Sequence, residues 1–174
     1  MTLLDQIHAL LTDHDVAHAL IGAAALAAHG VSRSTLDQDV LVTDRRVLAA
    51  TFWTTLGSQV TVDVRVGDAD DPLAGMVRMT QASERDVDVI VGRHAWQADA
   101  LARSLDLGPS HIPVVQVADL ILLKLYAGGS QDRWDIEQLV ALHTSTVSEA
   151  VDDRVTALPA DCQRQWKLLR PTAR

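Results

Sequence analysis

Two short segments limit what this chain can fold into, because each combines aspartates with a run of branched apolar residues. They are Asp37-Gln38-Asp39-Val40-Leu41-Val42 and Asp86-Val87-Asp88-Val89-Ile90-Val91. Valine- and isoleucine-rich runs of this length favour β-strands. On a strand, residues i and i+2 point to the same face, with Cα atoms about 6.5–7 Å apart. Each segment therefore predicts a strand with two carboxylates on one face, which repel each other unless a cation neutralises them.

The apolar periodicity of the other segments predicts a fold of class α/β (α+β), in which a short mixed β-sheet is flanked by helices. Residues 1–145 are expected to form the main domain, and residues 146–174 a helical extension of it, so that the C-terminal third is helical. We predict strands over 17–21, 37–42, 60–66, 76–80, 86–91 and 112–116. We predict helices over 2–13, 23–28, 45–56, 94–104, 118–127, 132–145 and 147–169, the last with a break at Pro159.

Composition excludes several classes of protein. With 174 residues, 48% hydrophobic and 22% charged, the chain has the balance of one folded domain. Its single cysteine, Cys162, excludes an internal disulfide framework and a cysteine zinc site. No apolar run reaches the roughly 18–20 residues that span a bilayer, and the N-terminus does not read as a signal peptide. We therefore expect a cytoplasmic protein without a membrane partner.

If the two acidic strands are neighbours, Asp37, Asp39 and Asp88 converge at one end of the sheet. Carboxylate oxygens suit Mg²⁺ or Mn²⁺, and such a set can bind the metal ions of a phosphoryl-transfer site. The alternative for Asp37 and Asp39 is a solvated strand face. The alternative for Asp88 is a salt bridge to Arg85 or Arg93, and Asp86 is expected in solvent at the strand start.

A turn of small residues, Gly22-Ala23, leads from a strand-like stretch into an alanine-rich helix fifteen residues before Asp37. Small residues at such a turn let backbone N–H groups approach a phosphate. The same pair is also common where a helix simply packs closely.

Lys124 lies in the most apolar predicted helix, LILLKLYAG. A lysine there must reach solvent, pair with an acid or contact a ligand. A ligand role is one interpretation, and a buried ion pair with Asp135 or Glu137 is the other. Asp132 is a candidate N-cap of the following helix, which leaves Asp135 as the preferred site residue.

Together these features resemble the nucleotidyltransferase fold of the polymerase β-like superfamily. The stretch IGAAALAAHGVSRSTLDQDVLV is similar to the AbiEii/AbiGii-type toxin–antitoxin nucleotidyltransferases. The block from Asp119 to Ala127, followed by DRWDI, resembles the C-terminal motifs of that family. The resemblance covers roughly residues 16–142.

The resemblance implies a metal-dependent transfer of a nucleoside monophosphate from an NTP to a hydroxyl group of an RNA, such as tRNA, or of a protein. Mg²⁺ or Mn²⁺ would be bound by Asp37, Asp39 and Asp88, and Asp88 would help to deprotonate the acceptor. The NTP would contact Gly22, Ala23, Arg33, Thr35 and Lys124, with Lys124 and Asp135 completing the catalytic set. Ala23 departs from the glycine or serine that the superfamily usually has there.

Three function classes remain open. A toxin-like transferase would modify RNA, which the basic residues after Asp161 favour and the net charge of −8 does not. An antitoxin-like transferase would modify a partner toxin, and a non-catalytic module would bind a nucleotide or a cognate toxin or antitoxin. The histidines are interpreted as surface or packing residues, and Trp53, Trp96, Trp134 and Trp166 as anchors of the core.

Overall fold

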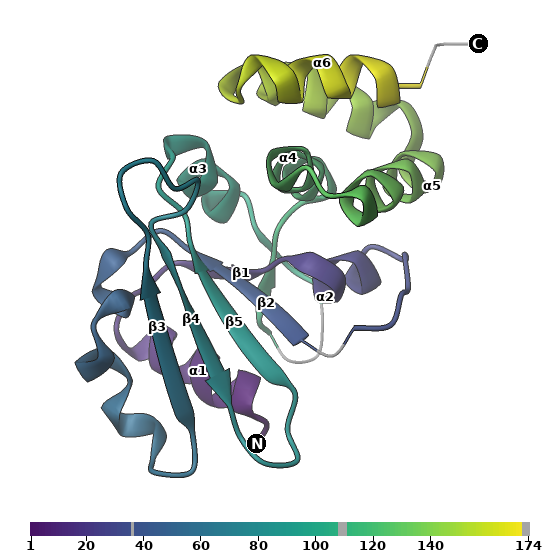
Figure 1. The fold of residues 1–174 in the computed structure, drawn as a ribbon. Coiled ribbons are helices and arrows are strands. Elements are labelled where there is room, and N and C mark those ends of the chain that lie inside the picture. Colours follow the sequence, from purple (N-terminus) through teal and green to yellow (C-terminus); the bar gives the residue numbers. More distant parts are fainter. Residues whose placement is uncertain (36, 108–110, 172–174) are drawn as a thin grey trace.

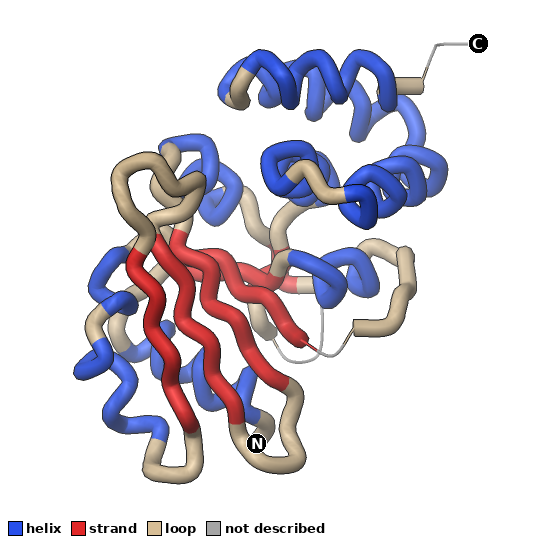
Figure 2. Tube along the Cα trace, viewed as in Figure 1, coloured by secondary structure: helices blue, strands red, loops and turns tan. Residues whose placement is uncertain are grey.

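The computed structural model describes residues 1–35, 37–107 and 111–171. Within these ranges seven strands form one sheet, in the order β3-β4-β5-β2-β1-β7-β6. Figures 1 and 2 show β3, β4 and β5 side by side, with β2 and β1 beyond them. The strands are β1 (His18–Leu20), β2 (Asp37–Val42), β3 (Thr61–Val66), β4 (Gly75–Thr80), β5 (Asp86–Val91), β6 (Leu105–Asp106) and β7 (Pro113–Val114). The predicted fold of helices around a short mixed sheet is confirmed.

The helices form two groups around this sheet. They are α1 (Leu3–Asp13), α2 (Gly22–Ala28), α3 (Ala95–Ala102), α4 (Val117–Ala127), α5 (Ser130–Arg154) and α6 (Ala160–Leu169). Figure 1 shows α1 behind the sheet, whereas α4, α5 and α6 form a separate helical layer beyond the end of the sheet where α2 and α3 lie. The helical C-terminal third is therefore confirmed.

The two acidic strands are neighbours. β2 and β5 pair in parallel, with Asp37 opposite Asp86 and Asp39 opposite Asp88. β1 and β4 flank this pair, both antiparallel to it. Valines 40, 42, 87, 89 and 91 and Leu41 are buried, so the apolar half of each strand lies in the core. The aspartates consequently lie together where the two strands begin.

The helix predicted over 45–56 is confirmed only in part. The segment forms two 3-10 helices, Arg45–Leu48 and Ala50–Leu56, separated by an extended Ala49. Asp44 accepts a hydrogen bond from the backbone N–H of Arg46, so the predicted cap is present. The indole N–H of Trp53 donates to the carbonyl oxygen of Val47. In a continuous α-helix this oxygen would accept from the backbone N–H four residues further on. Burial of Trp53 therefore overrides the helical periodicity.

The C-terminal helices differ from prediction in their boundaries. α5 runs without a break from Ser130 to Arg154, through the interruption predicted between 145 and 147 and through the boundary placed at residue 145. It ends in a short 3-10 turn, and α6 begins directly after Pro159, where the break is predicted.

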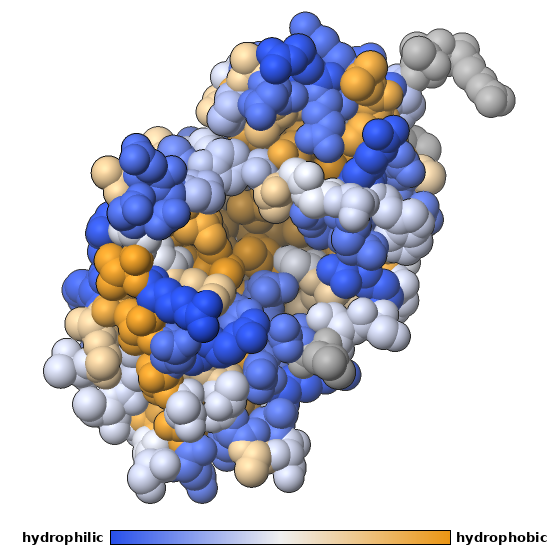
Figure 3. Space-filling view, viewed as in Figure 1, coloured by the Kyte–Doolittle hydropathy of each residue, from blue (hydrophilic) through white to orange (hydrophobic). Residues whose placement is uncertain are grey.

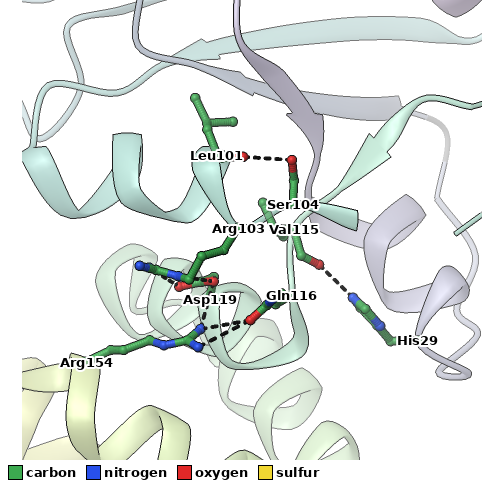
Figure 4. Close-up of polar contacts among 8 residues, drawn as sticks. All are labelled: His29, Leu101, Arg103, Ser104, Val115, Gln116, Asp119 and Arg154. Carbon is green, nitrogen blue, oxygen red and sulfur yellow. Dashed lines mark hydrogen bonds and ion pairs between the residues drawn. The ribbon is translucent and has the colours of Figure 1, made fainter. Parts of the chain in front are cut away.

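A buried acid ties the helical layer to α3. Asp119 on α4 is fully buried and accepts hydrogen bonds from Arg103, at the end of α3, at 2.7 and 3.1 Å. It also accepts one from Arg154, at the end of α5, at 2.9 Å. Figure 4 shows the two guanidinium groups approaching Asp119 from different elements, with Gln116 bound to Arg154. This arginine–aspartate cluster fixes α4 relative to α3 and α5.

The tryptophans do not all anchor the core. Trp53, Trp96 and Trp166 are buried, which confirms that interpretation for three of them, but Trp134 on α5 is 41% exposed, so for this residue it is wrong. Over the ranges that the structure describes, no helix combines the length and the apolar character needed to cross a bilayer.

Candidate active site

Asp39 sits directly against the turn between β1 and α2. The backbone N–H of Ile21 donates to the carbonyl oxygen of Asp39 at 2.9 Å. Gly22 has a φ of +58°, and a Cβ atom at this position would overlap the Asp39 carboxylate. Glycine is therefore required both by the backbone conformation and by the approach of the carboxylate. Gly22 is the first residue of α2, and its lack of a side chain leaves room for the Asp39 carboxylate.

The surroundings of Asp39 contain an excess of negative charge. Burial raises the pKa of Asp39, and the neighbouring carboxylates of Asp88 and Asp37 raise it further. Lys124 and Arg33 act in the opposite direction without cancelling these effects. A divalent cation at the Asp37 and Asp39 carboxylates would relieve this repulsion.

Arg78 on β4 neutralises part of this charge, and it is the residue that the sequence analysis missed. Its Nε and Nη2 donate to Asp88 Oδ1 and Oδ2 at 2.8 and 2.6 Å, and Nη2 lies 3.5 Å from Asp37 Oδ2. These acids raise the pKa of the Arg78 guanidinium. The predicted alternative named Arg85 or Arg93, but Arg93 instead donates to carbonyl oxygens of the 67–75 loop.

The signal for Arg78 was present in the sequence. β4 and β5 form a hairpin around residues 81–85, and counting outward from this turn places Arg78 directly opposite Asp88. A cross-strand pair of opposite charges is a usual way to stabilise such neighbours.

The carboxylates fit a divalent cation in part. Asp37 and Asp39 supply hard oxygen ligands in a region short of positive charge, which suits Mg²⁺ or Mn²⁺. Asp88 already gives both carboxylate oxygens to Arg78. In the described part of the chain, no three His, Cys, Asp or Glu side chains are arranged to hold a metal ion. The three predicted ligands lie on the paired strands β2 and β5, but they do not form a three-carboxylate metal site, because Arg78 binds both oxygens of Asp88.

Two cations approach Asp39 from other elements. Lys124 is 4% exposed, and its Nζ lies 2.5 Å from Asp135 Oδ2 and 3.1 Å from Asp132 Oδ1. Arg33 Nε lies 3.4 Å from Asp135 Oδ1. The buried ion pair between Lys124 and Asp135 is confirmed. Asp135 thus joins Lys124 and Arg33 into one ion-pair network beside Asp39.

The remaining predicted residues have local roles in this structure. Asp132 is the third residue of α5 rather than its N-cap, and accepts from the backbone N–H of Gly129. The Thr35 hydroxyl donates to the carbonyl oxygen of Asp37 at 3.1 Å, which braces the start of β2. Ala23 is buried, so its methyl group packs in the fold.

The site therefore lies between the two layers. The carboxylates of Asp37, Asp39 and Asp88 come from the sheet, whereas Lys124, Asp132 and Asp135 come from the helical layer. Figure 3 shows the surface hollowed between these layers, with apolar and polar side chains on its walls. A ligand that spanned the site would place a negatively charged group beside Lys124 and Arg33. Near the carboxylates it would present oxygen atoms that can share a bound metal ion with Asp37 and Asp39.

Comparisons with known proteins show the fold. No family model matches the chain, and no curated protein matches its sequence. A candidate nucleotidyltransferase from H. pylori is similar in structure, with a TM-score of 0.51, 13% identity, and 98% of this chain and 96% of that chain covered. The antibiotic-resistance factor ANT(2'')-Ia, solved in complex with adenylyl-2''-tobramycin, gives a TM-score of 0.50 at 16% identity, with 97% and 95% covered. The chain thus has the fold of nucleotidyltransferases, as the resemblance implied.

Proposed function

We propose that this protein is a metal-dependent nucleotidyltransferase that moves a nucleoside monophosphate from an NTP to a hydroxyl group of an RNA or a protein. The observation that carries the proposal is the parallel pairing of β2 and β5, which brings Asp37, Asp39 and Asp88 together beside two cations. The shared fold of nucleotidyltransferases supports it.

In the proposed reaction, the acceptor oxygen forms a bond to the α-phosphorus, and the bond to the departing pyrophosphate breaks. Asp37 and Asp39 would hold Mg²⁺, which supplies charge neutralisation and orientation of the phosphates. Lys124 and Arg33 would offset the charge of the triphosphate from the helical side. The acceptor proton would pass to Asp88 once Arg78 no longer binds both of its oxygens.

The toxin–antitoxin context is the finer part of the proposal. Its support is the sequence resemblance over residues 16–142, including Arg33 and Thr35 ahead of the aspartates. ANT(2'')-Ia shows that this fold accommodates a small adenylylated acceptor. For this chain we propose an RNA or a partner protein as the acceptor.

A second candidate function is a non-catalytic nucleotide- or partner-binding module. The bidentate bond between Arg78 and Asp88 favours it, because it occupies the carboxylate that would accept the proton. The two candidates differ in whether transfer occurs after binding.

Calorimetric titration with each of the four NTPs, with and without Mg²⁺, tests the proposal. We expect binding that requires Mg²⁺ and that is lost in Asp39→Asn. Asp63→Asn is the matched control, because Asp63 is an exposed strand aspartate paired with Arg65 on β3. Absence of binding to every NTP by the folded protein would overturn the proposal.

A transfer assay then separates the two candidates. The protein is incubated with Mg²⁺ and α-labelled NTPs, together with total tRNA or with the product of a neighbouring gene. Label in RNA or in protein identifies the acceptor class. Binding without transfer to either would favour the non-catalytic module.

A further inference from the structure

Trp134 is the tryptophan that the fold does not use for its core. It lies near the beginning of α5, next to the fully buried Asp135 of the ion-pair network. Its 41% exposure contrasts with 2% for Trp53, 7% for Trp96 and 2% for Trp166. Exposure of a large aromatic side chain beside a charged site is typical of a binding surface.

Two surface hollows meet at Trp134. One, of 360 Å³, is lined by Trp134 with Arg33, Ser34 and Gln131. The other, of 480 Å³, is lined by Trp134 with the 30–32 segment and, further along α5, Gln138 and Leu142. Both volumes are within the range of small-molecule sites, about 300–1,000 Å³. The indole is therefore open to a ligand in either hollow.

The smaller hollow adjoins the candidate active site through Arg33. This arginine lines the hollow, and its Nε is 3.4 Å from Asp135, which in turn contacts Lys124. The positive charges of Lys124 and Arg33 both lower the pKa of Asp39, in opposition to burial and the neighbouring acids. A ligand that stacked on Trp134 would thus have a cation, Arg33, within the same hollow, on the side that faces the candidate active site.

The polar groups around Trp134 define the ligand further. The Gln131 amide nitrogen donates to Asp135 Oδ1 at 3.3 Å, its amide oxygen can accept, and the Ser34 hydroxyl can donate and accept; both residues line the hollow with the indole. A nucleobase has a π-face that stacks on an aromatic ring and an edge of donors and acceptors. An aliphatic or simple aromatic side chain could contact the indole but would make no use of those polar groups. The shelf formed by Trp134, Arg33, Ser34 and Gln131 fits a nucleobase best.

We propose that this shelf is a nucleobase subsite of the active site. The proposal rests on the proposed function, since it assigns a place to the base of a nucleotide whose phosphates lie near the carboxylates. The base comes from one of two sources, the donor NTP or the terminal nucleotide of an RNA acceptor. The chemistry of stacking is the same for both.

Trp134→Ala and Trp134→Phe test the proposal, with Leu168→Ala as the control at an exposed apolar residue of α6. The probes are the four NTPs, a tetraribonucleotide and inorganic tripolyphosphate, each titrated calorimetrically in the presence of Mg²⁺. Quenching of tryptophan fluorescence is a second readout, because the other three tryptophans are buried. Circular dichroism melting establishes that each variant is folded.

Trp134→Ala is expected to weaken binding of one nucleotide probe about tenfold, the size of one lost stacking contact. Trp134→Phe should stay within about threefold of the wild type, and tripolyphosphate binding should not change. A loss with NTPs assigns the subsite to the donor base, and a loss with the tetranucleotide alone assigns it to the acceptor.

Two results would overturn the proposal, and they differ in what they leave standing. If NTPs bind and Trp134→Ala changes neither NTP nor tetranucleotide binding, the subsite is wrong and the proposed function remains. If the folded wild-type protein binds neither the NTPs nor the tetranucleotide, both are wrong.

Discussion

At the scale of single residues, Gly22 is the position in the site where a larger side chain is least tolerated, because it lies against the Asp39 carboxylate. Gly22→Ala would place a methyl group on the Asp39 carboxylate and strain a backbone with φ of +58°. We expect a loss of about 2–4 kcal/mol in the free energy of unfolding, from overpacking and left-handed strain together. Mg²⁺-dependent NTP binding should also be lost, because Asp39 must rotate away. Urea unfolding and calorimetry measure the two effects.

Gly57→Ala is the matched control for this prediction. Gly57 has a φ of +82°, and a Cβ atom there meets no atom within 4 Å. It should cost backbone strain alone, about 1–3 kcal/mol, because its ψ of 162° together with the positive φ is a conformation that almost only glycine adopts, and it should leave nucleotide binding unchanged. Loss of nucleotide binding in both variants, or in neither, would contradict the role of the Gly22 contact.

Arg78 holds the position between two carboxylates that a cation would otherwise take. Arg78→Gln should release Asp88 and Asp37, and we expect Mn²⁺ to bind at least about tenfold more tightly than to the wild type, since charge pairs at this distance are worth about 1 kcal/mol or more. Mn²⁺ titration followed by electron paramagnetic resonance measures the affinity without any substrate.

Arg65→Gln is the control, because Arg65 is also a strand arginine paired with an aspartate, Asp63, but on the exposed face of β3. It should leave Mn²⁺ affinity unchanged. Unchanged affinity in Arg78→Gln as well would show that the arginine does not compete with a metal ion.

At the scale of elements, the arginine–aspartate cluster predicts how strongly the layers are joined. Asp119→Asn should lower the free energy of unfolding by about 2–4 kcal/mol, because it leaves two arginines facing a neutral, buried group. Both arginines are partly exposed, which keeps the loss below that of a fully buried pair.

Asp152→Asn is the comparison variant in the same urea unfolding experiment. It breaks a half-exposed pair with Arg170 and keeps a side-chain oxygen that can still accept from the indole N–H of Trp166, so a much smaller loss is expected. If the two variants lost similar amounts, the buried cluster would not be what joins α4 to α3 and α5.

The sequence predicts those elements whose own residues decide their structure. The acidic strands and the β1–α2 turn follow from local alternation and small residues, and their pairing then places the carboxylates. The 45–56 segment does not follow, because the hydrogen bond from Trp53 to Val47 depends on packing. The exposure of Trp134 cannot be predicted from the sequence either. Periodicity shows on which face of a helix a residue lies, but not whether another element covers that face. For Lys124, the sequence shows that a buried charge needs an acid or a ligand, and it offers Asp135 and Glu137 as possible acids without deciding between these outcomes.

At the scale of the whole molecule, acid should destabilise the fold through histidines held in their neutral form. Burial lowers the pKa of His18 and of His29 below the ordinary value of 6.5. The unfolded chain therefore binds protons that the folded chain does not, so stability is full above about pH 6.5 and falls as the pH drops below it. His111, whose pKa Asp106 raises, acts in the opposite direction, but it is exposed. Urea midpoints at pH 7.5 and 5.5 measure the difference.

His29→Gln tests the assignment. It can keep a hydrogen bond to the carbonyl oxygen of Val115 without titrating. The fall in midpoint between the two pH values should become smaller than in the wild type. A fall of the same size would attribute the acid sensitivity to other groups.

The division of the site between two layers has a consequence for how such a protein changes over generations. The carboxylates belong to the segment that ends before α4, whereas Lys124, Asp135 and Trp134 belong to the α4–α5 hairpin. Exchange of the hairpin for another helical pair, by recombination, would replace Lys124 together with Gln131 and Trp134 of the shelf, and would leave the aspartates, Arg33 and Ser34 in place. Under the proposed function, the carboxylates and the aromatic part of the shelf are thus inherited on separate stretches of the gene, and either stretch can change while the other is retained.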